Sequence, residues 1–172
     1  MFNLRRLMLP ALVALLLATS ASAAFAGGPV TVTHESADGA ILTWSMSPDN
    51  CKQLQVPLSG TGEQHQEKTT KVYADGSSTI LINDLVKGTA SDSTGTYHFS
   101  YTNHSTETVP AGGGAHQVQM VDSFVLNGNG SAKLNVGFNW RWTFTPPALY
   151  WPPVDNWQKI SDRGDPLNCD PI

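Results

Sequence analysis

Asp122 lies in a segment whose other alternate residues are apolar. Val118, Met120, Phe124 and Leu126 share its parity, so a strand here would place a carboxyl group on an apolar face. A buried carboxyl group needs a partner, or its pKa rises until it can exchange protons near neutral pH. Two interpretations follow: a functional acid in a barrel mouth, or a carboxylate at a strand end or bulge that is bonded to backbone amides.

Aromatic residues are concentrated in one stretch of eighteen residues, namely Trp140, Trp142, Phe144, Tyr150, Trp151 and Trp157. Such rings can form an apolar pocket or a platform for sugar rings, and ordinary core packing is the alternative. The candidate ligand-binding residues are therefore Trp140, Trp142, Trp151 and Trp157, with Asp122 and His98 as the polar groups.

The five histidines contain no close pair of the H-x-H or H-x-x-x-H kind. His98 and His104 are six residues apart, which is roughly 20 Å along a strand and too far to share one ion. The sequence also has no nucleophile elbow and no phosphate-binding loop. We therefore expect no metal site, no cofactor and no catalytic residue. Asn103-His104-Ser105 is an N-glycosylation sequon, and the sequence does not decide whether Asn103 is modified.

Cys51 and Cys169 are the only two cysteines. In an exported protein, two cysteines most simply form one disulfide. This bond would close a loop of 118 residues and hold the C-terminal segment against the rest of the protein.

Residues 1–26 have the features of a secretory signal peptide. Arg5 and Arg6 form a basic start, residues 11–18 are apolar, and Ala24-Phe25-Ala26 is an A-x-A cleavage site. Cleavage after Ala23 is an alternative. The strongly apolar segment favours Sec-type export over a twin-arginine signal, and it is too short to span a bilayer. The sequence predicts a protein secreted to the periplasm or the cell exterior, without a membrane span.

Loss of Arg5 and Arg6 with the signal peptide would leave eight basic and all fourteen acidic residues, so the formal charge would change from −4 to −6. An acidic surface argues against nucleic acid as a partner. The sequence leaves the oligomeric state open.

Period-two alternation recurs along the chain, and turn signals such as Asp75-Gly76 and Asn127–Gly130 separate the alternating runs. We expect about eight strands in an antiparallel β domain over residues 27–145, closed as a single barrel or packed as a two-sheet sandwich. The expected strands are Val30–His34, Ala40–Ser45, Gln53–Gly60, Thr69–Ala74, Ser78–Val86, Thr96–Thr102, Gln117–Leu126 and Ser131–Thr145.

Prolines are frequent in residues 146–172, and proline disfavours regular strand and helix. This Pro/Trp-rich tail is expected to be an irregular wrap over one end of the β domain, tied down by the disulfide.

The hairpin formed by Asp122–Gly130 and the strand Leu134–Phe144 resembles those of small eight-stranded barrels of the lipocalin or allene-oxide-cyclase type. The resemblance implies a ligand cavity inside a barrel. The Gly-x-Trp of lipocalins is not present near the first strand, where Trp44 follows Leu42-Thr43. No functional residue is carried over from either family.

Three functions are compatible with these features. The favoured hypothesis is non-catalytic binding of a small apolar ligand or a glycan. The second is a cofactor-free enzyme of the isomerase or cyclase type, acting in a cavity that contains Asp122 or His98. The third is a structural or surface-associated interaction protein, which would have a filled interior and an exposed apolar patch.

Overall fold

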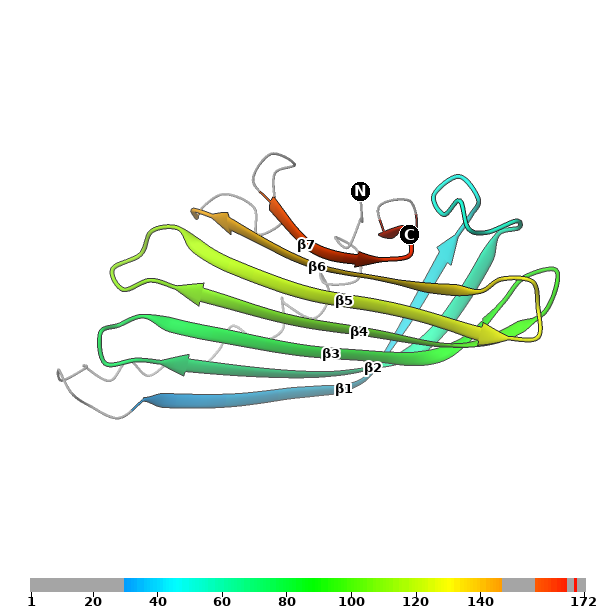
Figure 1. Ribbon diagram of the computed structural model, residues 1–172. Coiled ribbons are helices and arrows are strands. Elements are labelled where there is room, and N and C mark those ends of the chain that lie inside the picture. Colours follow the sequence, from blue (N-terminus) through cyan, green and yellow to red (C-terminus); the bar gives the residue numbers. More distant parts are fainter. Residues whose placement is uncertain (1–29, 147–156, 167–168, 170–172) are drawn as a thin grey trace.

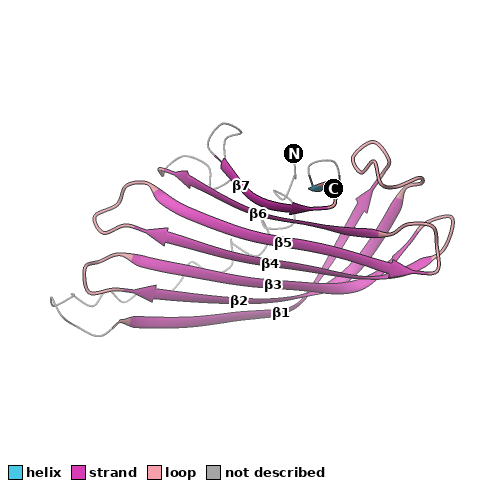
Figure 2. Ribbon diagram, in the orientation of Figure 1, coloured by secondary structure: helices cyan, strands magenta, loops and turns pink. Residues whose placement is uncertain are grey.

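The computed structural model describes residues 30–146, 157–166 and 169. The described chain is all-β, as Figure 2 shows, and its seven strands form one antiparallel sheet in sequence order. The strands are β1 (Thr31–Met46), β2 (Leu58–Val72), β3 (Ser78–Ser91), β4 (Thr96–Val109), β5 (His116–Gly128), β6 (Leu134–Phe144) and β7 (Trp157–Arg163). No helix in these ranges is long and apolar enough to cross a membrane.

The turns between successive strands have the expected chemistry. Asp75 Oδ1 accepts a 2.9 Å hydrogen bond from the backbone N–H of Ser77 between β2 and β3, and Gly76 has φ +83°. Asp92 Oδ1 likewise accepts from the backbone N–H groups of Thr94 and Gly95 between β3 and β4. Asx turns of this kind fix the hairpin ends. The predicted hairpin through Asn127–Gly130 is confirmed, since Leu126 pairs with Leu134.

The strands are longer than the sequence predicted. Two expected strands, Val30–His34 and Ala40–Ser45, are parts of the single strand β1. Asp38-Gly39 is not a turn between them but a β-bulge, with Gly39 at φ +82°. The polar run Glu63–Lys68 belongs to β2 and was missed because that half of the strand is exposed or half-exposed at most positions, so no apolar residue alternates there.

The sheet is rolled at one end and open at the other. Figure 1 shows the C-terminal half of β1 and the N-terminal half of β2 bending away and rising behind the ends of β5 and β6. At the bend Gly62 pairs with Gly88. A Cβ on Gly62 would lie 2.6 Å from the Phe99 ring, so only glycine allows this close approach.

The main core fills the rolled end. Its buried side chains come from β1 to β6 and from the loop that follows β1, and they include Trp44, Met46, Leu58, Phe99, Leu126 and Leu134. Trp44 contacts the rings of Phe99 and Phe124 edge-on, at centroid distances of 5.1 and 5.3 Å. These side chains define the inner face of the sheet, and the opposite, outer face carries Thr61, Thr89 and His98.

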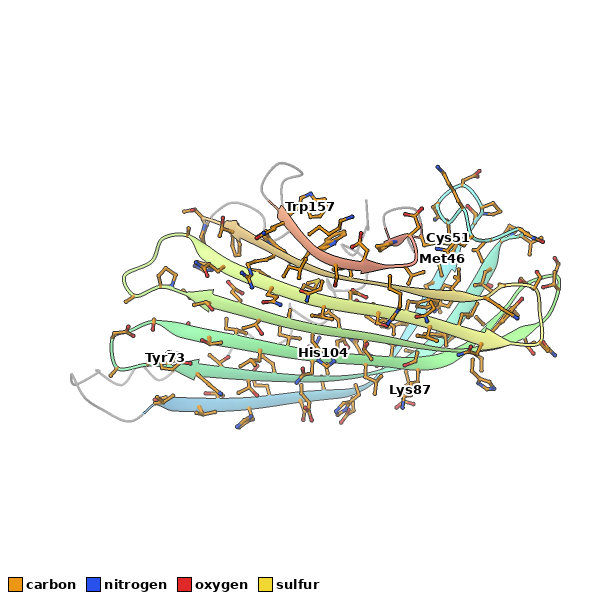
Figure 3. All side chains as sticks on the ribbon, in the orientation of Figure 1. Met46, Cys51, Tyr73, Lys87, His104 and Trp157 are labelled. Atoms are coloured by element: carbon orange, nitrogen blue, oxygen red, sulfur yellow. A yellow bond between two sulfur atoms is a disulfide. The ribbon has the colours of Figure 1, made fainter. Side chains whose placement is uncertain are left out.

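The expected barrel and the expected sandwich are both wrong for the described chain. A barrel requires its first and last strands to pair, whereas β1 pairs only with β2 and β7 only with β6. A sandwich requires two sheets, and the described strands form one. The rolled end is instead fastened covalently, because the predicted Cys51–Cys169 disulfide is present and joins the loop after β1 to the segment after β7. Figure 3 labels Cys51 beside Met46 at this end.

A second, smaller core lies on the inner face of β5 and β6. It consists of Val118, Met120, Phe138, Trp140 and Trp142, with Phe144 and Trp157 packed against it. Trp157 begins β7, which corrects the expectation that residues 146–172 are irregular throughout. The seven residues of β7 can form a regular strand because none of them is proline.

Candidate functional site

Four polar side chains are buried in the middle of the inner face, on four neighbouring strands. They are Gln64 on β2, Asp84 on β3, Asn103 on β4 and Asp122 on β5, with exposed fractions of 6, 7, 0 and 5 %. The register places Asp84 opposite Asn103, and Asn103 opposite Asp122. We call these four residues, together with Tyr101, the polar belt. Polar groups are rarely so deeply buried without a structural or functional reason.

Hydrogen bonds within the polar belt satisfy most of its atoms. Gln64 Nε2 donates to both carboxylate oxygens of Asp84, at 2.8 Å each. Asp122 Oδ2 accepts from the Tyr101 hydroxyl at 2.8 Å and from Asn103 Nδ2 at 3.3 Å. Asn103 Oδ1 is buried and has no hydrogen-bond partner among the described residues.

The belt carries two acidic groups without a cation. None of the ion pairs within the described residues includes Asp84 or Asp122. Burial raises the pKa of Asp122 to about 7, and it outweighs the opposing effect of the hydrogen bonds from Tyr101 and Asn103; the charge of Asp84 raises it further. Burial also raises the pKa of Asp84. Near neutral pH the belt therefore both accepts hydrogen bonds and exchanges a proton.

An aromatic stack continues the polar belt toward β7. Asp122 lies opposite Phe138 in the register. The Phe138 ring stacks on Trp140 at a centroid distance of 4.0 Å, and Trp140 contacts Trp157 at 4.8 Å. Trp140 Nε1 donates to Asp162 Oδ1 at 3.1 Å, which fixes the orientation of its ring. Trp157 is only half-buried, so part of this stack faces solvent (Figure 3).

The structure brings together four of the six residues predicted for the site. Asp122, Trp140, Trp142 and Trp157 share the inner face of β5, β6 and β7. Asp122 lies in the middle of β5, where the pairing with β4 and β6 is uninterrupted. The alternative of a strand end or a bulge is therefore wrong. Trp151 lies outside the described residues.

His98 does not belong to this group. It pairs with Thr89 and is exposed on the outer face, because its parity on β4 is opposite to that of Phe99 and Tyr101. There it lines an open hollow of about 800 Å³. Other lining residues are Thr43, Ser59, Thr61, Thr89 and Ser91. His98 and Asp122 lie on opposite faces of the sheet, so they cannot belong to one site.

Four residues of the polar belt were missed by sequence reasoning. Tyr101 and Asn103 share the inner-face parity of Tyr97 and Phe99 on β4, and this alternation was the one signal that could have found them. Gln64 has no such signal, because it stands in a polar run. Asp84 shares the parity of Ile80, Ile82 and Val86, so the kind of interruption that revealed Asp122 was also present there and was overlooked. Asn103 is fully buried, so its sequon lies on a face where a glycan could not be attached to the folded protein.

No cluster of three or more His, Cys, Asp or Glu side chains that could hold a metal ion occurs in the described ranges. Among the described residues, the deeply buried acidic side chains are those of the polar belt. Their carboxylate oxygens already accept hydrogen bonds from neutral donors. The chemistry that this chain itself offers at the belt is hydrogen bonding, aromatic stacking and proton exchange.

Comparisons with known proteins do not assign the chain to a family. No family model matches the sequence, no curated protein matches it, and no solved structure matches its fold. The function of the chain must therefore be inferred from the geometry of the site.

Proposed function

We propose that the protein is exported and binds a saccharide on the inner face of its sheet, at the polar belt and the adjoining aromatic stack, without catalysing a reaction. The observation that carries this proposal is that the polar belt continues into an aromatic stack whose last ring, Trp157, is half-buried. Hydrogen-bond acceptors beside aromatic rings suit a ligand that has both hydroxyl groups and an apolar face.

The neighbours of Asn103 suit a ligand with several hydroxyl groups. Asp84 and Asp122 are acceptors on either side of it, and the Tyr101 hydroxyl lies beside Asp122. A purely apolar ligand would bury these groups without compensating them. A saccharide offers hydroxyl donors to the belt, so we favour the glycan over the small apolar ligand.

The aromatic stack supplies the second element of saccharide recognition. The C–H face of a pyranose packs on an aromatic ring while its hydroxyl groups point sideways. Trp157 is half-buried and belongs to the stack that begins opposite Asp122. A single ligand could therefore contact Trp157 and the belt at the same time.

Export and the partner class belong to the same proposal. The Cys51–Cys169 disulfide is the kind of bond that persists in an oxidising compartment, and the signal-like residues 1–26 provide the route. The acidic charge of the chain without those residues disfavours nucleic acid. We infer a periplasmic or extracellular location without a membrane span.

One observation favours a second candidate, a cofactor-free enzyme. Asp122 has a pKa of about 7, and a carboxyl group with such a pKa can act as a general acid or base at neutral pH. In this case a saccharide bound at the belt would be chemically changed rather than released intact.

A glycan array probed with the oxidised, exported form would test the proposal, using neutral oligosaccharides of glucose, galactose and N-acetylglucosamine. The best probe would then be titrated by calorimetry against Trp157→Ala and Asp122→Asn, with the exposed outer-face variant Thr61→Ala as a matched control. We expect both inner-face variants to weaken binding by about tenfold or more and the control to leave it unchanged.

Failure of the folded protein to bind any oligosaccharide would contradict the proposal. Equal loss in all three variants would show that binding is not located on the inner face. NMR spectra of the recovered probe distinguish the second candidate, because conversion that is lost in Asp122→Asn would identify an enzyme.

A further inference from the structure

The two outer edges of the sheet are very different. β7 is a short edge of seven residues, it contains Lys159, Asp162 and Arg163, and its pairing with β6 is interrupted by a bulge. Short length, charge and bulges are the devices that prevent one sheet edge from pairing with another. β7 is therefore a protected edge.

β1 is a long edge of sixteen residues. Ten of its first eleven residues, Thr31 to Ile41, are exposed, and Val32 and Ile41 have exposed fractions of 45 and 66 %. β2 is its only partner among the described strands, and Figure 1 shows β1 as the outermost strand at the bottom of the sheet. Backbone N–H and C=O groups along the other side of this strand have no partner strand within the described residues.

We propose that two copies of the chain associate through β1, which pairs antiparallel with β1 of the second copy about a twofold axis at Ser36. The paired segment runs from His34 to Asp38 and would join the two sheets edge to edge. This interaction is independent of the saccharide site, which lies on the inner face of β2 to β6.

A second copy of the chain is the partner that fits this edge, because β1 is complementary to itself in this register. A twofold axis at Ser36 places His34 of each copy opposite Asp38 of the other. His34, Ser36 and Asp38 lie on the same face, since their partners Thr69, Glu67 and His65 alternate along β2. An axis one residue earlier would place Glu35 opposite Glu35, and like charges directly opposite are unfavourable.

The polar and charged side chains near the axis have hydrogen-bonding atoms available for this pairing. His34 Nδ1 is hydrogen-bonded to Thr69 Oγ1 at 3.0 Å, which leaves its Nε2 for the partner copy. Asp38 contacts His65 through Oδ1, and its second oxygen can accept from His34 of the partner copy. Glu35 pairs with Lys68 within its own sheet, at 3.2 Å, and does not need the interface.

The bulge at Gly39 limits the length of the new ladder. Pairing is continuous only up to this point, so the interface is small and the association is weak. We expect the dimer to form only at high protein concentration, as for other small, transient interfaces.

Sedimentation velocity of the oxidised protein between about 10 μM and 1 mM tests the proposal. The average mass should rise toward that of a dimer with concentration. His34→Asp, which places two carboxylates opposite each other, should weaken association by about tenfold or more. The charge-swapped double variant His34→Asp/Asp38→Lys should restore it to within about threefold, whereas Gln158→Asp on the β7 edge should have no effect.

Ser36→Cys provides a second, independent readout, because only a residue on the twofold axis lies opposite the same residue of the second copy. Mild oxidation should link it into a covalent dimer, and Thr61→Cys on the outer face should not be linked. A protein that stays monomeric at 1 mM would overturn the proposal. So would association that His34→Asp leaves unchanged, or that saccharide-site variants abolish.

Discussion

Gly62 and Gly88 lie directly opposite each other on β2 and β3, and the Phe99 ring covers both of them. A Cβ on Gly88 would lie 2.1 Å from the backbone oxygen of Thr61 and 2.8 Å from the Phe99 ring. The two glycines thus let the strands approach closely where the sheet bends, and an aromatic side chain fills the volume that their missing side chains leave.

Gly62→Ala is expected to destabilise the fold. Its Cβ would lie 2.6 Å from Phe99 Cζ and 2.8 Å from the backbone oxygen of Lys87. The backbone cannot yield as a flexible side chain could, so we expect a loss of about 2–3 kcal/mol in the free energy of unfolding. Urea titration measures this loss, and Thr61→Ala, at an exposed neighbouring position, should change it by less than about 0.5 kcal/mol.

The alternation of β4, β5 and β6 was predictable because one face of these strands is buried along most of their length. The same rule found only parts of β1 and β2, because the residues between those parts are mostly polar and give no apolar alternation that would mark one face as buried. Closure was not predictable either. The choice between an open sheet and a barrel depends on whether β1 meets the last strand, and no local pattern encodes that contact.

The candidate site was predictable only where an unusual residue interrupted an apolar pattern. Asp122 stands among Val118, Met120 and Leu126, so its burial could be inferred from parity alone. Asp84 shares the parity of Ile80, Ile82 and Val86, but Leu81 and Leu85 on the other parity hide this alternation, so the register that places Asn103 opposite it was needed to show which face it occupies. Such a cross-strand relationship exists only in the folded sheet.

Asp122 should make the stability of the protein depend on pH. An Asp carboxyl of the unfolded chain titrates near pH 4, whereas the folded pKa is raised to about 7. Between these values the folded state keeps a proton that the unfolded state releases, so the free energy of unfolding falls as pH rises and levels off above about pH 7. The loss is on the order of 4 kcal/mol across the window.

Asp122→Asn removes this contribution. Urea titrations between pH 4 and 8 should therefore show a shallower decline for the variant than for the unmodified protein. Asp84, whose pKa is also raised, acts in the same direction in both proteins and leaves a residual slope. Parallel declines in the two proteins would show that Asp122 does not titrate in this range.

Tyr101→Phe should raise the pKa of Asp122 further. The Tyr101 hydroxyl donates to Oδ2 of the carboxylate and stabilises the charged form, so its removal favours the protonated form. Carbon-13 NMR titration of the aspartate carboxyl groups measures the shift. Tyr73→Phe, which removes an exposed hydroxyl 3.4 Å from Thr79 Oγ1, is the matched control and should leave the Asp122 titration unchanged.

Reduction of the Cys51–Cys169 bond should destabilise the protein by about 4 kcal/mol, because the unfolded chain is released from a loop of 118 residues. Urea titration with and without dithiothreitol measures this difference. The double variant Cys51→Ser/Cys169→Ser should unfold like the reduced protein and should not respond to the reductant. Equal stability of the oxidised and reduced forms would show that the rolled end holds together by packing alone.

The disulfide also sets an order of events during synthesis. Cys51 precedes six of the seven strands and Cys169 follows all of them. At a synthesis rate of roughly 5–20 residues per second, the first thiol waits on the order of ten seconds for its partner. The chain contains no third cysteine, so during this interval it cannot form an incorrect bond with itself. The only thiols that can capture Cys51 prematurely belong to other molecules, and crowding of nascent chains is therefore the condition under which its maturation is most vulnerable.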